Sequence, residues 1–145
     1  MARILASLWA ALSLAPAAAA LDVAPGDIFV VSRPGPFARV FHIDPDTGAE
    51  TLVAQGGYLT ATSIEQKMAV SADGFVYVVQ GRDGNVPVGS GKLIRIDPTI
   101  DFDPQDPFAN QVLIRQGATF DFVEDLAVVP TSEPGSRRRA WGPRR

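Results

Sequence analysis

The densest group of chemically capable side chains is an aspartate-rich stretch between residues 97 and 106. Carboxylate oxygens are the ligands that Ca²⁺ prefers, and this stretch offers Asp97, Asp101, Asp103 and Asp106. The spacing departs from the calcium loop of helix-loop-helix proteins, because the sixth position counted from Asp101 is an aspartate and the twelfth is a valine. We therefore expect a solvated acidic loop, with a calcium site as the alternative.

The remaining residues give little support for a catalytic nucleophile or for a zinc site. The one histidine, His42, lies in a strand-like segment at a position that Arg95 occupies in a second, similar segment, so we expect it on the solvent side. The serines at positions 32, 63, 71 and 90 lie in no nucleophile-elbow pattern. The chain has no cysteine, which excludes disulfides and leaves no Cys/His pair for zinc.

The segments that must position these side chains are short and strand-like. Proline and glycine recur too often for amphipathic helices, and runs rich in Val, Ile, Phe and Tyr are bounded by turn residues. Turns are expected at 44–48, which reads Asp-Pro-Asp-Thr-Gly, and at 71–74, which ends in Asp-Gly. The pattern predicts strands at residues 27–31, 39–44, 51–55, 67–71, 75–80, 92–97, 111–115 and 126–129.

The strand pattern repeats itself within the chain. Four segments recur in the same order at offsets of 48, 53, 61 and 58 residues, which differ because the loops between them differ in length. The matched ranges are 28–31 with 76–79, 39–45 with 92–98, 52–56 with 113–117, and 68–70 with 126–128. A repeat of about 50 residues with four strands is typical of a propeller blade.

Two motifs carry a family resemblance. Residues 68–78 read apolar-Ala-Val-x-x-Asp-Gly-x-apolar-Tyr-Val, and residues 92–98 read basic-apolar-apolar-x-Ile-Asp-Pro. This resembles the repeat of NHL-type propellers, and of the related streptogramin lyase-like and gluconolactonase-like propellers, over roughly residues 24–130. The resemblance implies an all-β fold of antiparallel four-stranded blades, about two of them. Since a closed propeller has about 4 to 8 blades, we expect an incomplete propeller: a fragment, a truncated gene product, or a piece that self-associates.

The resemblance also implies a site. Lactonase-like propellers hold a divalent metal with acidic and amide side chains on the channel rim, just before the innermost strands. The matching residues here are Glu65, Glu124 and Asp125, with Asn85 as a further candidate. The alternative is that these are ordinary polar loop residues. No cofactor is expected on other grounds, and Ca²⁺ is the ion to test.

The two ends differ from the body. Residues 1–20 have the layout of a cleaved signal peptide, which predicts a secreted or periplasmic protein without a transmembrane segment in the mature chain. Residues 21–130 form the expected repeat region, and residues 131–145 an expected disordered basic tail. The body from 21 to 136 has 16 acidic residues against seven Lys and Arg, so nucleic acid is not an expected partner.

Two functions follow from these patterns. The first is an exported repeat module that acts as a non-catalytic binding or scaffold protein. The second is a metal-dependent lyase or lactonase-like enzyme with its acidic site on the channel rim. Such folds host both kinds of protein, so the motifs alone do not decide between them.

Overall fold

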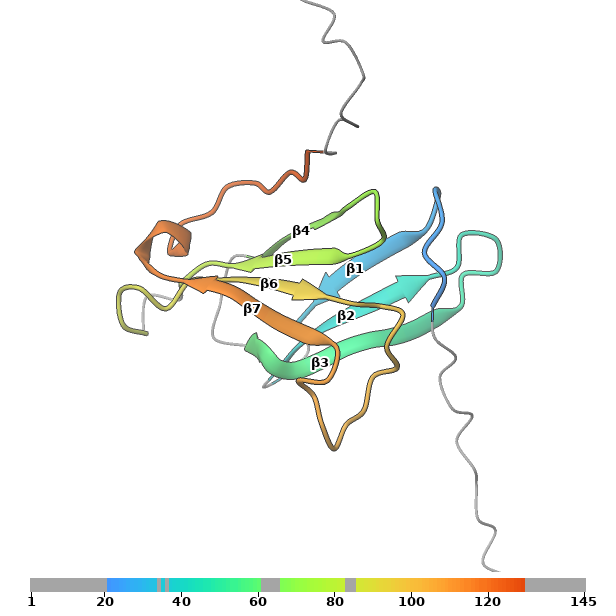
Figure 1. Cartoon of the computed structure of the whole chain (residues 1–145), viewed down its shortest axis with the longest axis horizontal. Coiled ribbons are helices and arrows are strands. Elements are labelled where there is room, and N and C mark those ends of the chain that lie inside the picture. The colour runs from blue at the N-terminus through green and yellow to red at the C-terminus, as the bar shows by residue number, and fades with distance from the viewer. Residues whose placement is uncertain (1–20, 34, 36, 61–65, 83–85, 130–145) are drawn as a thin grey trace, which may run out of the picture.

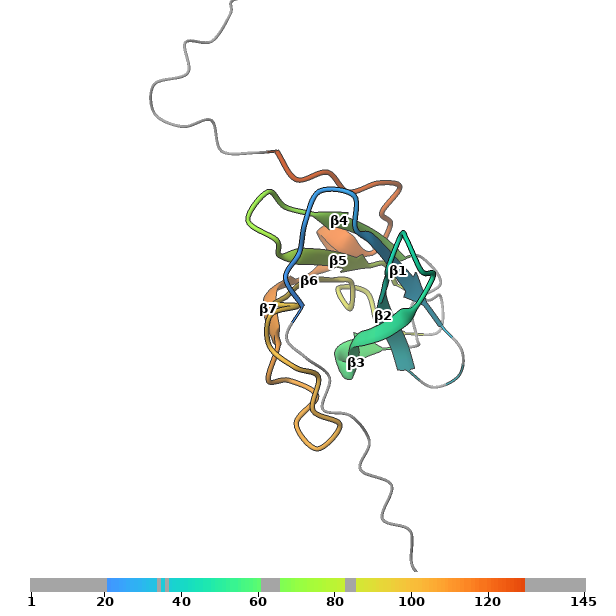
Figure 2. The same cartoon turned by 90° about the vertical axis from the view of Figure 1, so that its right-hand side faces the viewer.

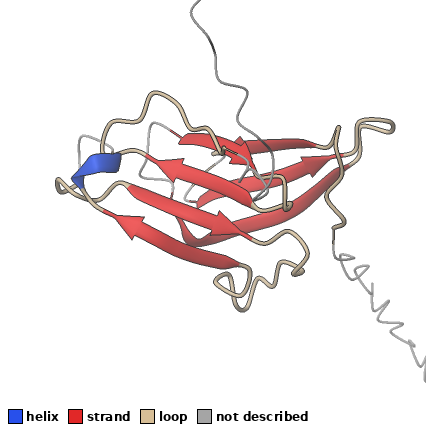
Figure 3. Cartoon of the chain, turned by 45° about the horizontal axis from the view of Figure 1, so that its top comes forward, coloured by secondary structure: helices blue, strands red, loops and turns tan. Residues whose placement is uncertain are grey.

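The computed structural model describes residues 21–33, 35, 37–60, 66–82 and 86–129, and it is all-β with two antiparallel sheets (Figure 1). The predicted signal peptide, residues 1–20, and the whole predicted tail, residues 131–145, lie outside these residues. The single helical element of the described part is a 3-10 turn, η1 (Ala118–Phe120). Figure 3 shows the strands of both sheets lying roughly along one common axis, with arrows that point both ways along it.

The three-stranded sheet has the order β1 (Ile28–Ser32), β2 (Phe37–Ile43), β3 (Glu50–Thr60). The turn between β2 and β3 forms where the sequence predicts it, because Asp44 Oδ1 accepts hydrogen bonds from the backbone N–H groups of Asp46 (2.8 Å) and Thr47 (3.0 Å). The strand β3 continues beyond the predicted end at residue 55. Gly56 and Gly57 bend it there with φ values of 67° and 61°, a region that glycine enters without strain.

The four-stranded sheet has the order β4 (Gln66–Val70), β5 (Val76–Gln80), β6 (Lys92–Ile96), β7 (Gln111–Gln116). The Asp-Gly turn between β4 and β5 also forms as predicted, with Gly74 at φ 84° and its N–H donating to the Ser71 carbonyl (3.0 Å). A longer connection joins β5 to β6, and the aspartate-rich stretch joins β6 to β7.

The two sheets pack face to face as separate layers (Figure 2). Their inner faces bury a common apolar core, and each fully buried aliphatic side chain contributes about 1.5–3 kcal/mol. The buried core residues are Ala38, Val40, Val53, Ala54, Leu59, Val76, Val78, Ile94 and Ile96, with Phe29, Val31, Tyr58, Met68 and Leu113 packed against them.

The strand pairing repeats between the sheets. Val30 faces Phe41 across β1 and β2, and their sequence counterparts Val78 and Ile94 face each other across β5 and β6. Even the irregularity in the pairing with the next strand recurs, between Val40 and Phe41 in one sheet and between Leu93 and Ile94 in the other. The internal repeat that the sequence predicts is therefore present in the registers, with β1, β2 and β3 equivalent to β5, β6 and β7.

One predicted strand is wrong. Residues 126–129 form no strand, although they match residues 68–70 of β4. A strand requires a neighbour for its backbone hydrogen bonds, and this segment has no paired neighbour in the described part of the chain. The first sheet has three described strands where the predicted blade has four, and the described residues form no closed propeller.

Candidate functional site

The predicted rim residues are only partly within the described structure. Glu124 and Asp125 are exposed and lie in the extended segment that follows η1. Asp125 uses its Oδ1 to accept a hydrogen bond from the N–H of Leu126 (2.8 Å). Glu65 and Asn85 lie outside the described residues.

Glu124 and Asp125 border a hollow of about 460 Å³ on the outer face of the four-stranded sheet. The hollow is mainly apolar, and the segment after η1 forms one wall while the sheet forms its floor. Its apolar lining consists of Val79, Leu93, Phe120, Phe122, Val123 and Leu126. Beside it, Val112 is 46% exposed and Ile114 47% exposed on β7. This face therefore offers apolar surface with acidic groups at one edge.

A buried carboxylate holds the wall of the hollow in place. Asp121, 2% exposed, accepts hydrogen bonds from the N–H groups of Gly89 (2.8 Å) and Gly91 (3.0 Å). The bond from Gly89, followed by that from Gly91 and the charge of Arg82, lowers the pKa of Asp121 from its ordinary 3.8, against the opposing effect of burial. No motif in the sequence points to this residue, because it is a lone aspartate between two phenylalanines.

The sheets are fixed to each other by buried amide side chains that sequence reasoning also missed. Gln111 accepts a hydrogen bond from Tyr58 N–H (3.1 Å) and donates to the carbonyls of Gly56 (3.2 Å) and Pro107 (2.6 Å). Gln80 bonds both backbone groups of Thr60, at 3.2 and 3.0 Å.

Asn110 donates from Nδ2 to the Val53 carbonyl at 2.7 Å. All three amides come from the four-stranded sheet or its β6–β7 connection, and all bond the backbone of β3. A glutamine or asparagine at the end of an apolar run was the only signal in the sequence.

The aspartate-rich stretch uses its carboxylates to form turns. Asp97 Oδ1 accepts from Thr99 N–H (3.0 Å) and from the Thr99 hydroxyl (2.6 Å), and Asp103 Oδ1 accepts from Gln105 N–H (2.7 Å). Among the described residues there is no group of three or more His, Cys, Asp or Glu side chains placed to hold a metal ion.

The expected place of His42 is wrong. It faces Phe29 across β1 and β2, on the inner side of the sheet, with ring centroids 5.3 Å apart and 12% of its side chain exposed. Its Nε2 lies 3.4 Å from Asp27 Oδ1 without the geometry of a hydrogen bond. Its counterpart Arg95 lies on the outer side, where the central guanidinium carbon of Arg95 is 4.5 Å from the centroid of the Phe75 ring. The two sheets thus present opposite faces of the same repeat to the core.

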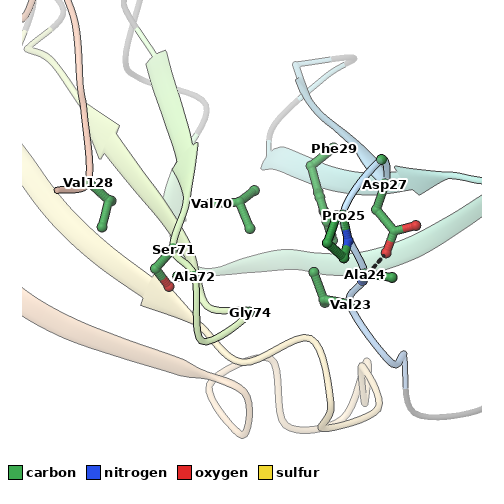
Figure 4. A pocket seen from close by; sticks show the side chains of 11 residues that line it. Val23, Ala24, Pro25, Asp27, Phe29, Val70, Ser71, Ala72, Gly74 and Val128 are labelled. Atoms are coloured by element: carbon green, nitrogen blue, oxygen red, sulfur yellow. Dashed lines mark hydrogen bonds between the residues drawn. The ribbon is translucent and has the colours of Figure 1, made fainter. Parts of the chain in front are cut away.

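A second hollow, of about 410 Å³, opens between the start of β1 and the β4–β5 turn (Figure 4). Asp27 is the one charged group among the described residues that line it, and the hydrogen bond from the N–H of Ala24 is the largest cause that lowers the pKa of this carboxyl. The Ser71 hydroxyl donates to the Phe75 carbonyl (3.0 Å). The described lining thus contains no nucleophile paired with a base.

Comparisons with known proteins leave the geometry as the only guide to function. No protein-family model, no curated protein and no solved structure matches this chain. The resemblance to NHL-type propellers stays a prediction. Within the described residues, no helix has the length and apolar character needed to cross a bilayer.

Proposed function

We propose that this chain is an exported β-repeat module that acts as a non-catalytic binding or scaffold protein, and that it binds through the outer face of its four-stranded sheet. The observation that carries this proposal is the apolar surface of that face. Val112, Ile114 and Phe122 are 46%, 47% and 75% exposed beside a mainly apolar hollow. Contiguous exposed apolar surface on a soluble domain typically marks an interaction site.

The surroundings of this surface fit a protein partner. Glu124 and Asp125 lie at one edge of the hollow, and the exposed Arg115 lies opposite Leu93 in the pairing of β6 with β7. An apolar centre with charged groups of both signs around it is the usual composition of a protein–protein interface. The partner we propose therefore presents a complementary apolar face.

The support for the face is structural as well as chemical. Buried amides hold the two sheets together, and Asp121 anchors the segment that forms the wall of the hollow. A surface on rigid elements loses little conformational freedom when it binds. The metal-dependent lyase or lactonase remains the alternative, and Glu124 and Asp125 are the residues through which it can be tested.

The test uses the mature chain and the dye 1-anilinonaphthalene-8-sulfonate, which fluoresces on apolar surface. We expect the folded, monomeric protein to bind the dye, and Ile114→Lys to reduce this binding. Val88→Lys is the matched control, since Val88 is 72% exposed in the β5–β6 connection and lies outside the hollow. Equal dye binding by both variants would refute the proposal that this face is the binding surface.

A second measurement addresses the enzyme. The mature chain is incubated with an aldonolactone with and without Ca²⁺, and opening of the lactone is followed. Calcium-dependent turnover that Asp125→Asn abolishes would overturn the non-catalytic assignment. Export is checked separately by measuring the intact mass of the released protein. We expect the mass of a chain that begins at Leu21.

A further inference from the structure

The three-stranded sheet lacks a strand at one defined place. In the described part of the chain β1 pairs with β2 alone, whereas its equivalent β5 pairs with both β6 and β4. Beside this edge, Ile28 and Val30 lie on the outer face of the three-stranded sheet and are 45% and 38% exposed, while their counterparts Val76 and Val78 lie on the inner face of the other sheet and are fully buried. An open strand edge of this kind is a template for another strand.

The segment 126–129 has the sequence of the missing strand. Leu126, Ala127 and Val128 match Met68, Ala69 and Val70 of β4, yet they have no paired neighbour among the described residues. The described part of the chain therefore contains both a strand-like segment that pairs with no strand and a strand edge that no strand covers.

The position of the segment shows where its partner sheet must lie. Met68 packs against the core between the two sheets, which includes Val40 and is contacted by Val31. Leu126 lies against Val79 and Leu93, the counterparts of those two valines, on the outer face of the four-stranded sheet. The segment is thus placed as the first strand of a further sheet stacked on that outer face.

The two outer faces of the molecule carry the same kinds of residue as the two inner faces, so they can pack against each other in the same way. The inner face of the four-stranded sheet carries Val76, Val78, Ile94 and Ile96, and the equivalent positions Ile28, Val30, Phe41 and Ile43 form the outer face of the three-stranded sheet. Likewise, Phe29, Val31 and Val40 on the inner face of one sheet correspond to Tyr77, Val79 and Leu93 on the outer face of the other. Two copies can therefore stack through the contact that already joins the two sheets within one copy.

We infer that copies of this chain associate head to tail, with residues 126–129 of one copy added as the fourth strand beside β1 of the next. The inference rests on the proposed function and identifies its partner as a second copy of this chain. The register follows from β4 and β5, where Met68 faces Val78 and Ala69 faces Tyr77. Leu126 then faces Val30, Ala127 faces Phe29, and Val128 faces Ile28.

The geometry favours a second copy over the chain's own β1. Leu126 lies on the face of the four-stranded sheet that points away from the three-stranded sheet. Val128 borders the same hollow as Phe29, but in the view of Figure 4 it lies on the other side of β4 from that side chain. A contact between two different faces is heterologous, so it continues from copy to copy as a closed ring or an open chain.

The absence of cysteine makes the register directly testable. Two single variants of the mature chain, Val30→Cys and Leu126→Cys, are mixed and oxidised. Facing residues in antiparallel strands lie about 4.5–5.5 Å apart at Cα, within the span of a disulfide. The control mixture is Val30→Cys with Ala127→Cys, whose side chains point to opposite faces of the added strand. We expect a mixed disulfide dimer in the first mixture and its loss in the control.

A second variant removes the exchanged strand without touching the fold. Ala127→Pro blocks strand pairing at an exposed position outside every described strand, and Ala127→Ser is its matched control. We expect Ala127→Pro to abolish concentration-dependent oligomers in light scattering while leaving the melting temperature of the dilute monomer unchanged. Ala127→Ser should assemble like the parent chain.

Three results would overturn the inference. They are equal disulfide yield in both mixtures, a disulfide that closes only within one chain when both cysteines are in the same molecule, and oligomers that persist in Ala127→Pro. Dye binding at a concentration where the chain is monomeric reports the surface itself. Failure of the strand exchange is therefore distinguishable from failure of the proposed binding function.

Discussion

Replacing Gln111 by leucine should destabilise the protein by breaking the contact between β7 and the bent part of β3. Gln111 is 5% exposed and makes three hydrogen bonds, to Tyr58 N–H, the Gly56 carbonyl and the Pro107 carbonyl. Leucine has a similar volume, so little packing is lost, but three backbone groups lose their partner. The expected effect is therefore that of unsatisfied polar groups.

The magnitude follows from how deeply each bond is buried. A buried polar group left unsatisfied costs about 1–3 kcal/mol. The bond to Gly56 is buried, whereas those to Tyr58 and Pro107 are partly buried, so water recovers part of their loss. We expect about 2–4 kcal/mol in total, which lowers Tm by about 8 °C or more in a domain of this size.

Chemical denaturation and thermal melting monitored by circular dichroism provide the assay. The matched control is Gln116→Leu, on the same strand at an exposed position, for which we expect less than about 0.5 kcal/mol. A third variant, Gln111→Glu, keeps the acceptor for Tyr58 but sets a carboxylate against two carbonyls. Burial raises the folded-state pKa of that carboxyl, so stability should be greater at low pH and fall as the pH rises through it.

Two outcomes would refute this reasoning. If Gln111→Leu melts with the parent chain, the amide does not hold the sheets together. If Gln116→Leu loses as much stability as Gln111→Leu, the effect belongs to leucine on β7 and not to the lost hydrogen bonds.

Three further predictions concern the wall of the hollow and the core. The lowered pKa of Asp121 means that its stabilising contribution is present above the unfolded value of 3.8 and is lost as the pH falls through the folded value; Asp121→Asn should flatten the acid side of Tm against pH, and an unchanged profile would contradict this. Gly91→Ala should cost about 1–3 kcal/mol in urea titration, because its Cβ would lie 2.3 Å from the Phe120 carbonyl carbon; a neutral result would show that η1 shifts freely. Ile94→Ala should cost about 2–5 kcal/mol, since Ile94 is fully buried, and Ile100→Ala, at a position 43% exposed, should cost clearly less.

Local chemistry made most of the strands predictable. Seven of the eight predicted strands are present, because short runs of β-branched and aromatic residues and the turn residues at their ends act over a few positions. The segment 126–129 has the same local chemistry as β4 and is no strand, since pairing depends on a neighbour and not on the segment itself. The predicted strand stops at residue 55 because glycines such as those at 56 and 57 usually mark the end of a strand. In the structure these two glycines bend β3, which continues beyond them.

The candidate site was less predictable than the strands. Glu124 and Asp125 do border a hollow, but the residues that build and hold it, such as Asp121 and Phe122, belong to no motif. His42 was expected at the surface because its counterpart is an arginine. Its burial follows from which face of the first sheet meets the second, and the two sheets use opposite faces.

The sequence by itself determined the all-β class, the tight turns, the internal repeat and the acidic body of this protein. These features depend on residue type and on spacing over a few positions. Only the tertiary structure decided which faces are buried, which amides join the sheets, and which strand edge and which segment have no pairing partner among the described residues. Those outcomes depend on contacts between residues that are far apart in the chain, such as Tyr58 with Gln111 and Gly91 with Asp121, and no local pattern encodes them.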